Sequence, residues 1–211
     1  MTAVYGTVGP NKRTVMSTLA VHRIIEEQAS THKDRPAIAD ANLTLSYHEL
    51  NREANGLARH LFAHGFGRGA LLAVPLRPTL DTAILLLAVL KTGGSYSLLA
   101  EDGNLCAWRA VPGALLECEP MALPDLASAP KSASVANLPV LSRGSDVACV
   151  VHSADGAAPM VVPHETIAAC RRDSIPQLAP WDGDPIGLDL WVGLMSGATV
   201  TLAEGLIEPA A

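Results

Sequence analysis

Apolar residues recur at helical spacing in some parts of the chain and form short unbroken runs in others. The helical spacing predicts helices over residues 17–29, 47–64, 80–91 and 188–195. The unbroken runs predict strands over residues 35–40, 42–45, 71–76, 95–99, 147–151 and 199–202. Helices that alternate with apolar strands are typical of an α/β fold. We therefore predict a mostly parallel sheet flanked by helices.

The predicted helix over residues 47–64 has the clearest start signal in the chain. Ser46 and Glu49 have the spacing of a capping box, in which each side chain bonds to the backbone N–H of the other residue. Gly65 and Gly67 follow the helix and favour its termination. One face of this helix is apolar and is expected to be buried, with Leu57 and Leu61 on it.

The same pattern predicts the domain organisation. Residues 1–15 are expected to form a loose leader, residues 16–205 one α/β domain, and residues 206–211 a tail. Within the domain, residues 119–145 contain four prolines among alanines and serines, which indicates a long connection.

Composition narrows the function classes. The net charge of −6, with no basic stripe, argues against nucleic acid and anionic membranes as partners. No apolar run is long enough to span a bilayer, so we expect a cytoplasmic protein. The four cysteines lack paired C-x-x-C spacing and are interpreted as reduced structural thiols. His60 and His64 are four residues apart, but without a third ligand they indicate surface histidines, and no metal site is assigned.

The segment over residues 146–167 carries the candidate site. An apolar strand, a loop of small residues and a helix start follow one another, which is the layout of a phosphate-binding turn. The loop nevertheless has one glycine, Gly156, no lysine, and a carboxylate at Asp155. Ser153, Asp155, His152 and His164 could instead form a nucleophile with an acid and bases, but no G-x-S-x-G elbow surrounds Ser153.

Three segments resemble motifs of nonribosomal peptide synthetase adenylation domains, which belong to the superfamily of acyl-AMP-forming, AMP-binding enzymes. Residues 45–50 (L-S-Y-H-E-L) resemble the first core motif of these domains. Residues 90–96 (L-K-T-G-G-S-Y) resemble the second, L-K-A-G-x-A-Y-V-P. Residues 191–199 are similar to the L-L-x-G-A-T segment. The resemblance implies the first N-terminal subdomain of an adenylation domain, and the chain corresponds to about the first two-fifths of one.

The resemblance also identifies the loop. In the family it reads roughly T-S-G-S-T-G-x-P-K-G and surrounds the ATP phosphates. Ser153, Gly156 and His164 match family positions, whereas Asp155 replaces a hydroxyl residue and Met160 replaces the lysine. The loop is also about two residues shorter. We therefore interpret Ser153, Asp155, Gly156 and His164 as a degenerate nucleotide-binding loop, and we assign no catalytic residue and no cofactor.

The resulting hypothesis is a truncated, catalytically deficient adenylation-like protein. It would act as a structural or partner-binding component of natural-product biosynthesis, through self-association or through a synthetase or carrier-protein partner. Two alternatives stay open at this point. The scaffold could catalyse a different reaction on a carrier-bound or small-molecule substrate, or the chain could be half of a split ligase completed in trans.

Overall fold

The computed structural model describes most of the chain between residues 19 and 202. The described ranges are 19–75, 77–99, 103–110, 118–129, 136–139, 141–151, 160–170 and 187–202. The α-helices are α2 (Val21–Thr31), α3 (Tyr47–Ala63), α4 (Leu80–Lys91), α5 (His164–Ala169) and α6 (Leu188–Met195). The strands are β1 (Pro36–Ala39), β2 (Thr44–Ser46), β3 (Ala70–Pro75), β4 (Ser95–Leu99), β5 (Cys106–Ala110), β6 (Cys118–Met121), β7 (Val147–Val151), β8 (Met160–Pro163) and β9 (Val200–Thr201). A short 3₁₀ helix, η1, covers Leu126–Ser128.

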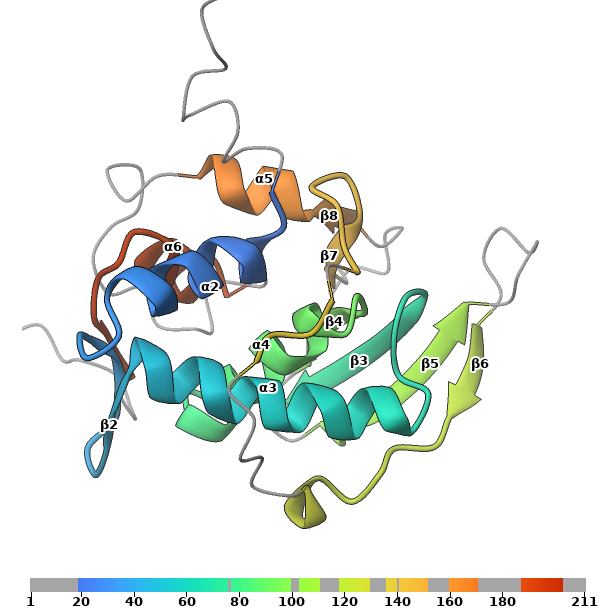
Figure 1. The fold of residues 1–211 in the computed structure, drawn as a ribbon. Helices are drawn as coiled ribbons and strands as arrows, with labels where there is room; N and C mark the ends of the chain where they lie inside the picture. Colours follow the sequence, from blue (N-terminus) through green and yellow to red (C-terminus); the bar gives the residue numbers. More distant parts are fainter. Residues whose placement is uncertain are drawn as a thin grey trace, which may run out of the picture.

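The larger sheet has six strands in the order β6-β5-β3-β4-β7-β8 (Figure 1). Its centre is parallel, because β4 pairs with both β3 and β7 in parallel. Its two sides are antiparallel, through β3–β5, β5–β6 and β7–β8. The predicted α/β class with flanking helices is confirmed, and the sheet is mixed, with the parallel pairing confined to its middle.

The hairpin β5–β6 is a feature that sequence reasoning missed. β6 extends to Met121, so the interpretation of residues 119–145 as a connection is wrong at its start. Pro120 obscured the strand, because a proline cannot donate to a sheet ladder. In the described sheet Pro120 lies on the outermost strand, opposite Trp108, where one side of the backbone needs no partner strand.

The smaller sheet joins the two ends of the described chain. Its order is β2-β1-β9, with β1 antiparallel to β2 and parallel to β9. The turn between β1 and β2 is held by the Asp40 carboxylate, which accepts hydrogen bonds from the backbone N–H groups of Asn42 and Leu43, both at 2.8 Å. This is the tight turn that the sequence predicts between these strands.

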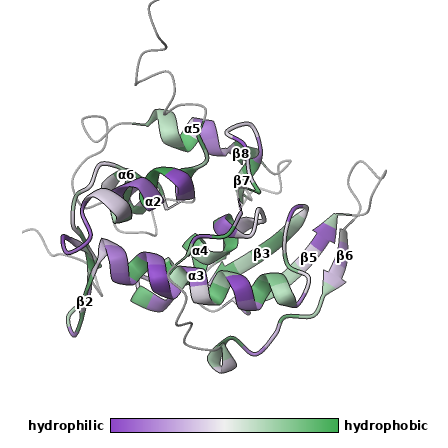
Figure 2. Ribbon diagram, viewed as in Figure 1, coloured by the Kyte–Doolittle hydropathy of each residue, from purple (hydrophilic) through white to green (hydrophobic). Residues whose placement is uncertain are grey.

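The helices form the layer that buries the core. α3 packs against α4, and α2 contacts α3, α4, α5 and α6. Figure 2 shows polar residues along α2 and α3 and a largely apolar α4 behind them. α4 is apolar on most sides because it is enclosed on most sides: Leu86, Leu87 and Leu90 are fully buried. The predicted capping box of α3 is confirmed, with Ser46 and Glu49 bonded reciprocally.

The turn after α4 requires glycine at two consecutive positions. Gly93 has a φ of +81°, a left-handed conformation that disfavours side chains. A Cβ on Gly94 would lie 2.5 Å from the Phe66 ring and 3.2 Å from the Ala70 carbonyl oxygen. The glycines of the second motif therefore allow β4 to start directly against the beginning of β3.

Two tyrosines of the motifs contact the last described helix and the turn that follows it. The Tyr47 hydroxyl lies 2.9 Å from the carbonyl oxygen of Leu194 and 2.8 Å from that of Ala198. The Trp191 indole N–H donates to the Tyr96 hydroxyl at 2.7 Å, and both side chains are buried. The three motif segments, distant in sequence, thus meet in one part of the core.

Leu61 and Leu57 on α3 differ in burial and give a test of the core. Leu61 is fully buried, whereas Leu57 is only partly buried, so the expectation that both lie on the buried stripe is corrected for Leu57. We expect Leu61→Ala to reduce the free energy of unfolding by about 2–5 kcal/mol, and Leu57→Ala by clearly less. Urea unfolding of both variants measures this. Equal losses would contradict the placement of the α3 face.

Candidate functional site

The candidate loop lies between two paired strands. β7 and β8 are antiparallel, with Val151 opposite Met160. The sequence predicts a strand, a loop and a helix; here a second strand, β8, intervenes before α5 begins at His164. Ser153, Asp155 and Gly156 lie outside the described residues, as does His152. Among the predicted site residues His164 is described, together with Met160 at the lysine position.

The start of α5 is bonded to the chain that precedes β7. The His164 N–H donates to the Asp146 carbonyl oxygen at 3.0 Å, and the Glu165 N–H donates to the Gly144 carbonyl oxygen at 2.8 Å. The first two backbone donors of the helix are therefore occupied by protein acceptors. A phosphate-binding helix start needs such donors to point at the ligand. In α5, two of the four free N–H groups of a helix start are therefore unavailable to a ligand.

Asp146 fixes the base of the same hairpin. Its carboxylate accepts a hydrogen bond from the Arg143 N–H at 2.8 Å and pairs with the Arg68 guanidinium. Arg68 comes from the turn before β3, so this ion pair ties the hairpin to the sheet's parallel centre. Both groups are partly exposed, and the pair orients the hairpin more than it stabilises it.

Met160 and Val161 present apolar side chains at the rim of the loop. Their relative exposures are 58% and 56%. The resemblance in sequence assigns Met160 to the position of the family lysine, and neither β7 nor β8 contains a charged residue. A thioether is at most a weak hydrogen-bond acceptor and cannot attract a phosphate. The described part of the rim can therefore make apolar contacts. It carries no cationic side chain that could bind an anion such as a phosphate.

His164 points into the core. Its ring is fully buried, its Nδ1 atom lies 3.4 Å from the Val21 nitrogen, and it meets the His22 ring edge-on at a centroid distance of 5.7 Å. Burial lowers the pKa of His164 to about 4, although the Asp146 carboxylate acts in the opposite direction. His164 is therefore neutral near pH 7 and belongs to the contact between α5 and α2.

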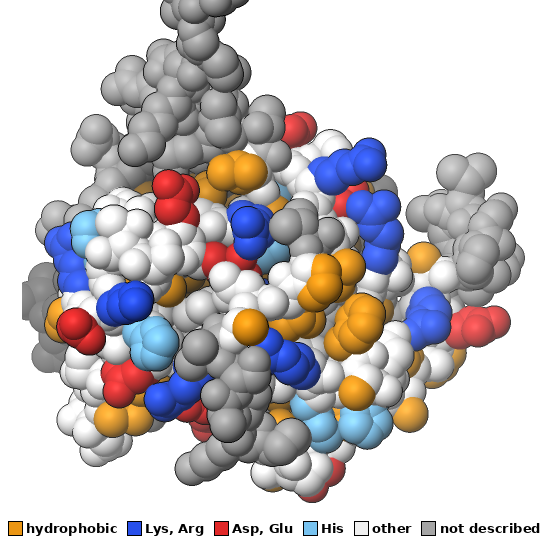
Figure 3. All heavy atoms as spheres, viewed as in Figure 1, with side chains coloured by type: hydrophobic (Ala, Val, Ile, Leu, Met, Phe, Trp, Pro, Cys, Tyr) orange, Lys and Arg blue, Asp and Glu red, His pale blue; other side chains and the backbone are white. Residues whose placement is uncertain are grey.

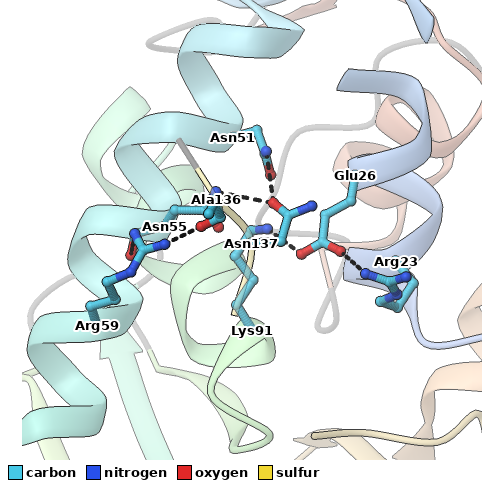
Figure 4. Close-up of polar contacts among 8 residues, drawn as sticks. All are labelled: Arg23, Glu26, Asn51, Asn55, Arg59, Lys91, Ala136 and Asn137. Carbon is cyan, nitrogen blue, oxygen red and sulfur yellow. Dashed lines mark hydrogen bonds and ion pairs between the residues drawn. The ribbon is translucent and has the colours of Figure 1, made fainter. Parts of the chain in front are cut away.

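Two neighbouring sets of polar contacts lie among the helices, one between α2 and α4 and one on α3 (Figure 4). The Lys91 ammonium donates to the Glu26 carboxylate at 2.5 Å, and Arg23 also contacts Glu26 at 2.5 Å. Lys91 has no exposed side-chain surface. Burial lowers its pKa to about 8, against the opposing effect of Glu26.

Asn137 is the centre of the second set of polar contacts, on the α3 side. Its side-chain oxygen accepts hydrogen bonds from the amide groups of Asn51 and Asn55, at 2.9 and 3.0 Å. Arg59 donates to the carbonyl oxygens of Asn55 and Ala136 (Figure 4). These bonds hold residues 136–139 along α3. Sequence reasoning missed both sets of contacts, and the signal for the first was a single lysine at the end of the apolar α4 segment.

The outer side of α3 carries a shallow groove and a histidine pair. The groove has a volume of about 270 Å³, and its lining is mostly apolar, including Phe62, Leu138 and Leu141. Figure 3 shows hydrophobic side chains gathered on this face among basic and histidine side chains. The His60 and His64 rings lie 4.6 Å apart, and His60 Nε2 is 3.1 Å from the Asp125 carbonyl oxygen.

Two further observations concern metal and membrane. In the described part of the chain, no group of three histidine, cysteine or acidic side chains is arranged to hold a metal ion. Cys106, Cys149 and Cys170 are free thiols, in agreement with the prediction for these three. None of the described helices combines the length and the hydropathy that crossing a membrane requires.

Comparison with known proteins identifies the fold. Residues 25–110 match the family model of AMP-binding enzymes. Tyrocidine synthase 1 of Brevibacillus parabrevis is 44% identical over 77 residues, which are 36% of this chain and 7% of that protein. Bacitracin synthase 1 of Bacillus licheniformis is 28% identical over an alignment that covers 87% of this chain and 4% of the synthase. The chain thus spans a small fraction of these curated relatives.

Solved structures of adenylation domains have a similar fold over nearly the whole length of this chain. The N-terminal subdomain of Klebsiella oxytoca NpsA, in complex with 3-hydroxybenzoyl-AMSN, has a TM-score of 0.69 at 19% identity and covers 98% of this chain and 58% of its own. The nonribosomal peptide synthetase FmoA3 has a TM-score of 0.70 at 18% identity and covers 93% of this chain and 26% of its own. The chain is a homologue of the N-terminal part of adenylation domains. The adenylation-like chain has the α/β fold of their N-terminal subdomain.

The buried pair of the adenylation-like chain gives the next test. Lys91→Met removes the ammonium from the buried Glu26 carboxylate and leaves the partly exposed Arg23 as its ion-pair partner, and we expect the free energy of unfolding to fall by up to about 3–5 kcal/mol. Combining Lys91→Met with Glu26→Gln also removes the buried carboxylate charge and should recover most of that loss. Chemical denaturation of the single and double variants measures both effects.

The exposed pair of Arg52 and Glu53 is the matched control, because both side chains are more than one-third exposed. Glu53→Gln should change the free energy of unfolding by about 0–1 kcal/mol. If Lys91→Met were as mild as this control, the buried pair would not hold α4 against α2.

Proposed function

We propose that this chain is a catalytically deficient adenylation-domain homologue that serves nonribosomal peptide or related natural-product biosynthesis as a structural or partner-binding component in the cytoplasm. One observation carries the proposal. The position of the phosphate-binding lysine is occupied by Met160, exposed at the rim of the loop on a strand without charge. The bonded N–H groups of His164 and Glu165 support it, because they are directed to protein carbonyls.

The expected effect on nucleotide affinity is large. A carboxylate about 5 Å from a phosphate repels it by roughly 3 kcal/mol at an effective dielectric constant near 20. Asp155 introduces such a charge into the loop sequence, and Met160 removes an attraction of comparable size. Each 1.4 kcal/mol is a factor of ten, so together the two changes weaken ATP binding by about four orders of magnitude.

The solved relatives bind ligands of the acyl-adenylate type, as their complexes with 3-hydroxybenzoyl-AMSN and α-methyl-L-serine-AMP show. That binding is a property of those proteins. The chain aligns with 58% and 26% of them, at 19% and 18% identity. The likeness at this level supports a shared fold, and the retention of ligand binding has to be tested on this chain.

Partner binding is supported by the surface of β8. Successive residues of a strand point to opposite faces, so exposed Met160 and Val161 place apolar surface on both sides of it. β8 is also the outermost strand of its sheet within the described residues. An apolar outer strand is suited to contact with a second copy of the chain or with a synthetase or carrier-protein partner.

Calorimetric titration with Mg-ATP tests the catalytic half of the proposal. We expect no saturable binding at millimolar nucleotide and no amino-acid-dependent pyrophosphate exchange. Met160→Lys combined with Asp155→Thr restores the charge and the hydroxyl, and should bring binding into the measurable range if these positions are the cause. Saturable binding by the unmodified chain would contradict the proposal and favour a split ligase completed in trans.

Val161→Lys combined with Asp155→Thr is the matched control for this titration. Val161 has nearly the same exposure as Met160, and the substitution adds the same charge one residue further along β8, on the other face. The control should restore less binding than the Met160 variant. Equal restoration would mean that added charge alone, rather than the lysine position, controls affinity.

Light scattering coupled to size exclusion tests the partner half. We expect a species larger than 22.0 kDa, either for the protein alone or after mixing with a co-encoded synthetase or carrier protein. Val161→Lys should shift that species toward the monomer, because a charge in an apolar contact is costly. A monomer under all conditions would refute this part of the proposal and leave the alternative of a different enzymatic reaction.

A further inference from the structure

His22 and His164 form a buried pair whose role is independent of the proposed function. His22 is 2% exposed on α2, and His164 is fully buried at the start of α5. Their rings meet edge-on with centroids 5.7 Å apart. His22 Nδ1 and His164 Nε2 have no hydrogen-bond partner among the described residues. Neither ring thus has an acceptor at these atoms that would stabilise an imidazolium.

The hydrogen bond between the His164 ring and Val21 requires a particular protonation state of the ring. The Val21 N–H at the start of α2 lies 3.4 Å from His164 Nδ1. Nδ1 can accept this bond only while it carries no proton, so the neutral ring has its proton on Nε2. A second proton would go to Nδ1 and would eliminate the acceptor. Protonation of His164 is therefore incompatible with the bond that joins the first turns of α2 and α5.

The charges around the pair oppose a cation at His22. Lys91 on α4 and Arg23 on α2 both disfavour protonation of His22, in addition to burial and to His164 itself, so its pKa lies well below the ordinary value. Asp146, before β7, favours a cation on His164. β8 carries no charge, and α6 contributes Asp189. Besides the neutral His164, α5 carries one acidic residue, the exposed Glu165.

We propose that the His22–His164 pair is an acid-sensitive contact that holds α5, and with it the β7–β8 hairpin, against α2. The closed arrangement requires two neutral rings. When α5 separates from α2, both rings reach solvent and regain their ordinary affinity for protons. Acid therefore favours the open arrangement, in which α5 and the strands β7 and β8 are released from α2.

The pH window follows from the two states of His164. Its pKa is about 4 when closed and the ordinary 6.5 when open. Above pH 6.5 neither state binds the proton, and the closed state keeps its full advantage. As the pH falls from 6.5 toward 4, the open state takes up protons that the closed state excludes. For His164 alone, the opening equilibrium constant should rise roughly 20-fold between pH 7 and pH 5.

Amide hydrogen exchange of the full chain, corrected for intrinsic rates, measures the opening. The reporter is the Val21 N–H group, whose acceptor, His164 Nδ1, lies across the contact between α2 and α5. Its protection should fall at least about 20-fold from pH 7 to pH 5, because His22 adds to the effect of His164. Amides in the middle of α3 should change far less. Constant protection of the Val21 N–H over this range would overturn the proposal.

His164→Asn separates titration from packing. The asparagine carbonyl oxygen can accept from the Val21 N–H, as Nδ1 does, but it does not titrate. The pH dependence of Val21 protection should shrink to the part that His22 contributes. His32→Asn, at the exposed end of α2, is the matched control and should retain the full change of the unmodified chain. Loss of the pH dependence in the control, or its full retention in His164→Asn, would refute the role of the pair.

Histidine ring NMR on the unmodified protein provides a readout that does not depend on any variant folding. At pH 5 the His164 and His22 rings should still be neutral in the closed state. Titration of His164 near pH 6.5 with the Val21 N–H still protected would overturn the proposal, because the closed state would then tolerate the charge.

Discussion

The buried ion pair between Lys91 and Glu26 is the constraint on which the helical layer depends. A charge in an apolar interior is tolerated only when its partner is in place, so the end of α4 can lie in few positions relative to α2. Such a pair contributes little net stability but excludes other arrangements of the two helices. Asn137 adds a second polar contact on the α3 side, which fixes residues 136–139 as well.

The family motifs of the chain are explained by packing rather than by chemistry. Tyr47 contacts the carbonyl oxygens at the end of α6, Tyr96 accepts from Trp191, and Lys91 pairs with Glu26. Each contact joins segments that are at least 65 residues apart in sequence. Motifs of this kind persist while the fold persists. They therefore support the fold strongly and carry no evidence that a reaction takes place.

Much of the fold could be predicted because its central elements have strong local signals. The bounds predicted for α4, β4 and α6 coincide with those of the structure, and the capping box of α3 forms as expected. The outer strands were missed for a physical reason. β5, β6 and β8 are short and pair only antiparallel at the sides of the sheet, so their sequences lack the long apolar run of a strand buried on both faces.

The candidate site was less predictable than the fold. The sequence of a loop does not determine which acceptors the backbone N–H groups on either side of it will bond to. The substitution at Met160 is visible in the sequence, but its exposure and the bonding of the first α5 amides are not. His164 illustrates the same limit. In the sequence it belongs to the loop motif, yet in the structure it contacts Val21 and His22 in the core.

The different environments of Met160 and His164 explain how a loop can lose its chemistry while the surrounding fold remains. Met160 faces solvent, so replacing a lysine there costs the core nothing. His164 is enclosed between α2 and α5, where replacement would leave a cavity and an unpaired Val21 N–H. Stability therefore retains the histidine whether or not nucleotide binds. Only a requirement for phosphate binding would retain a lysine at an exposed position of this kind.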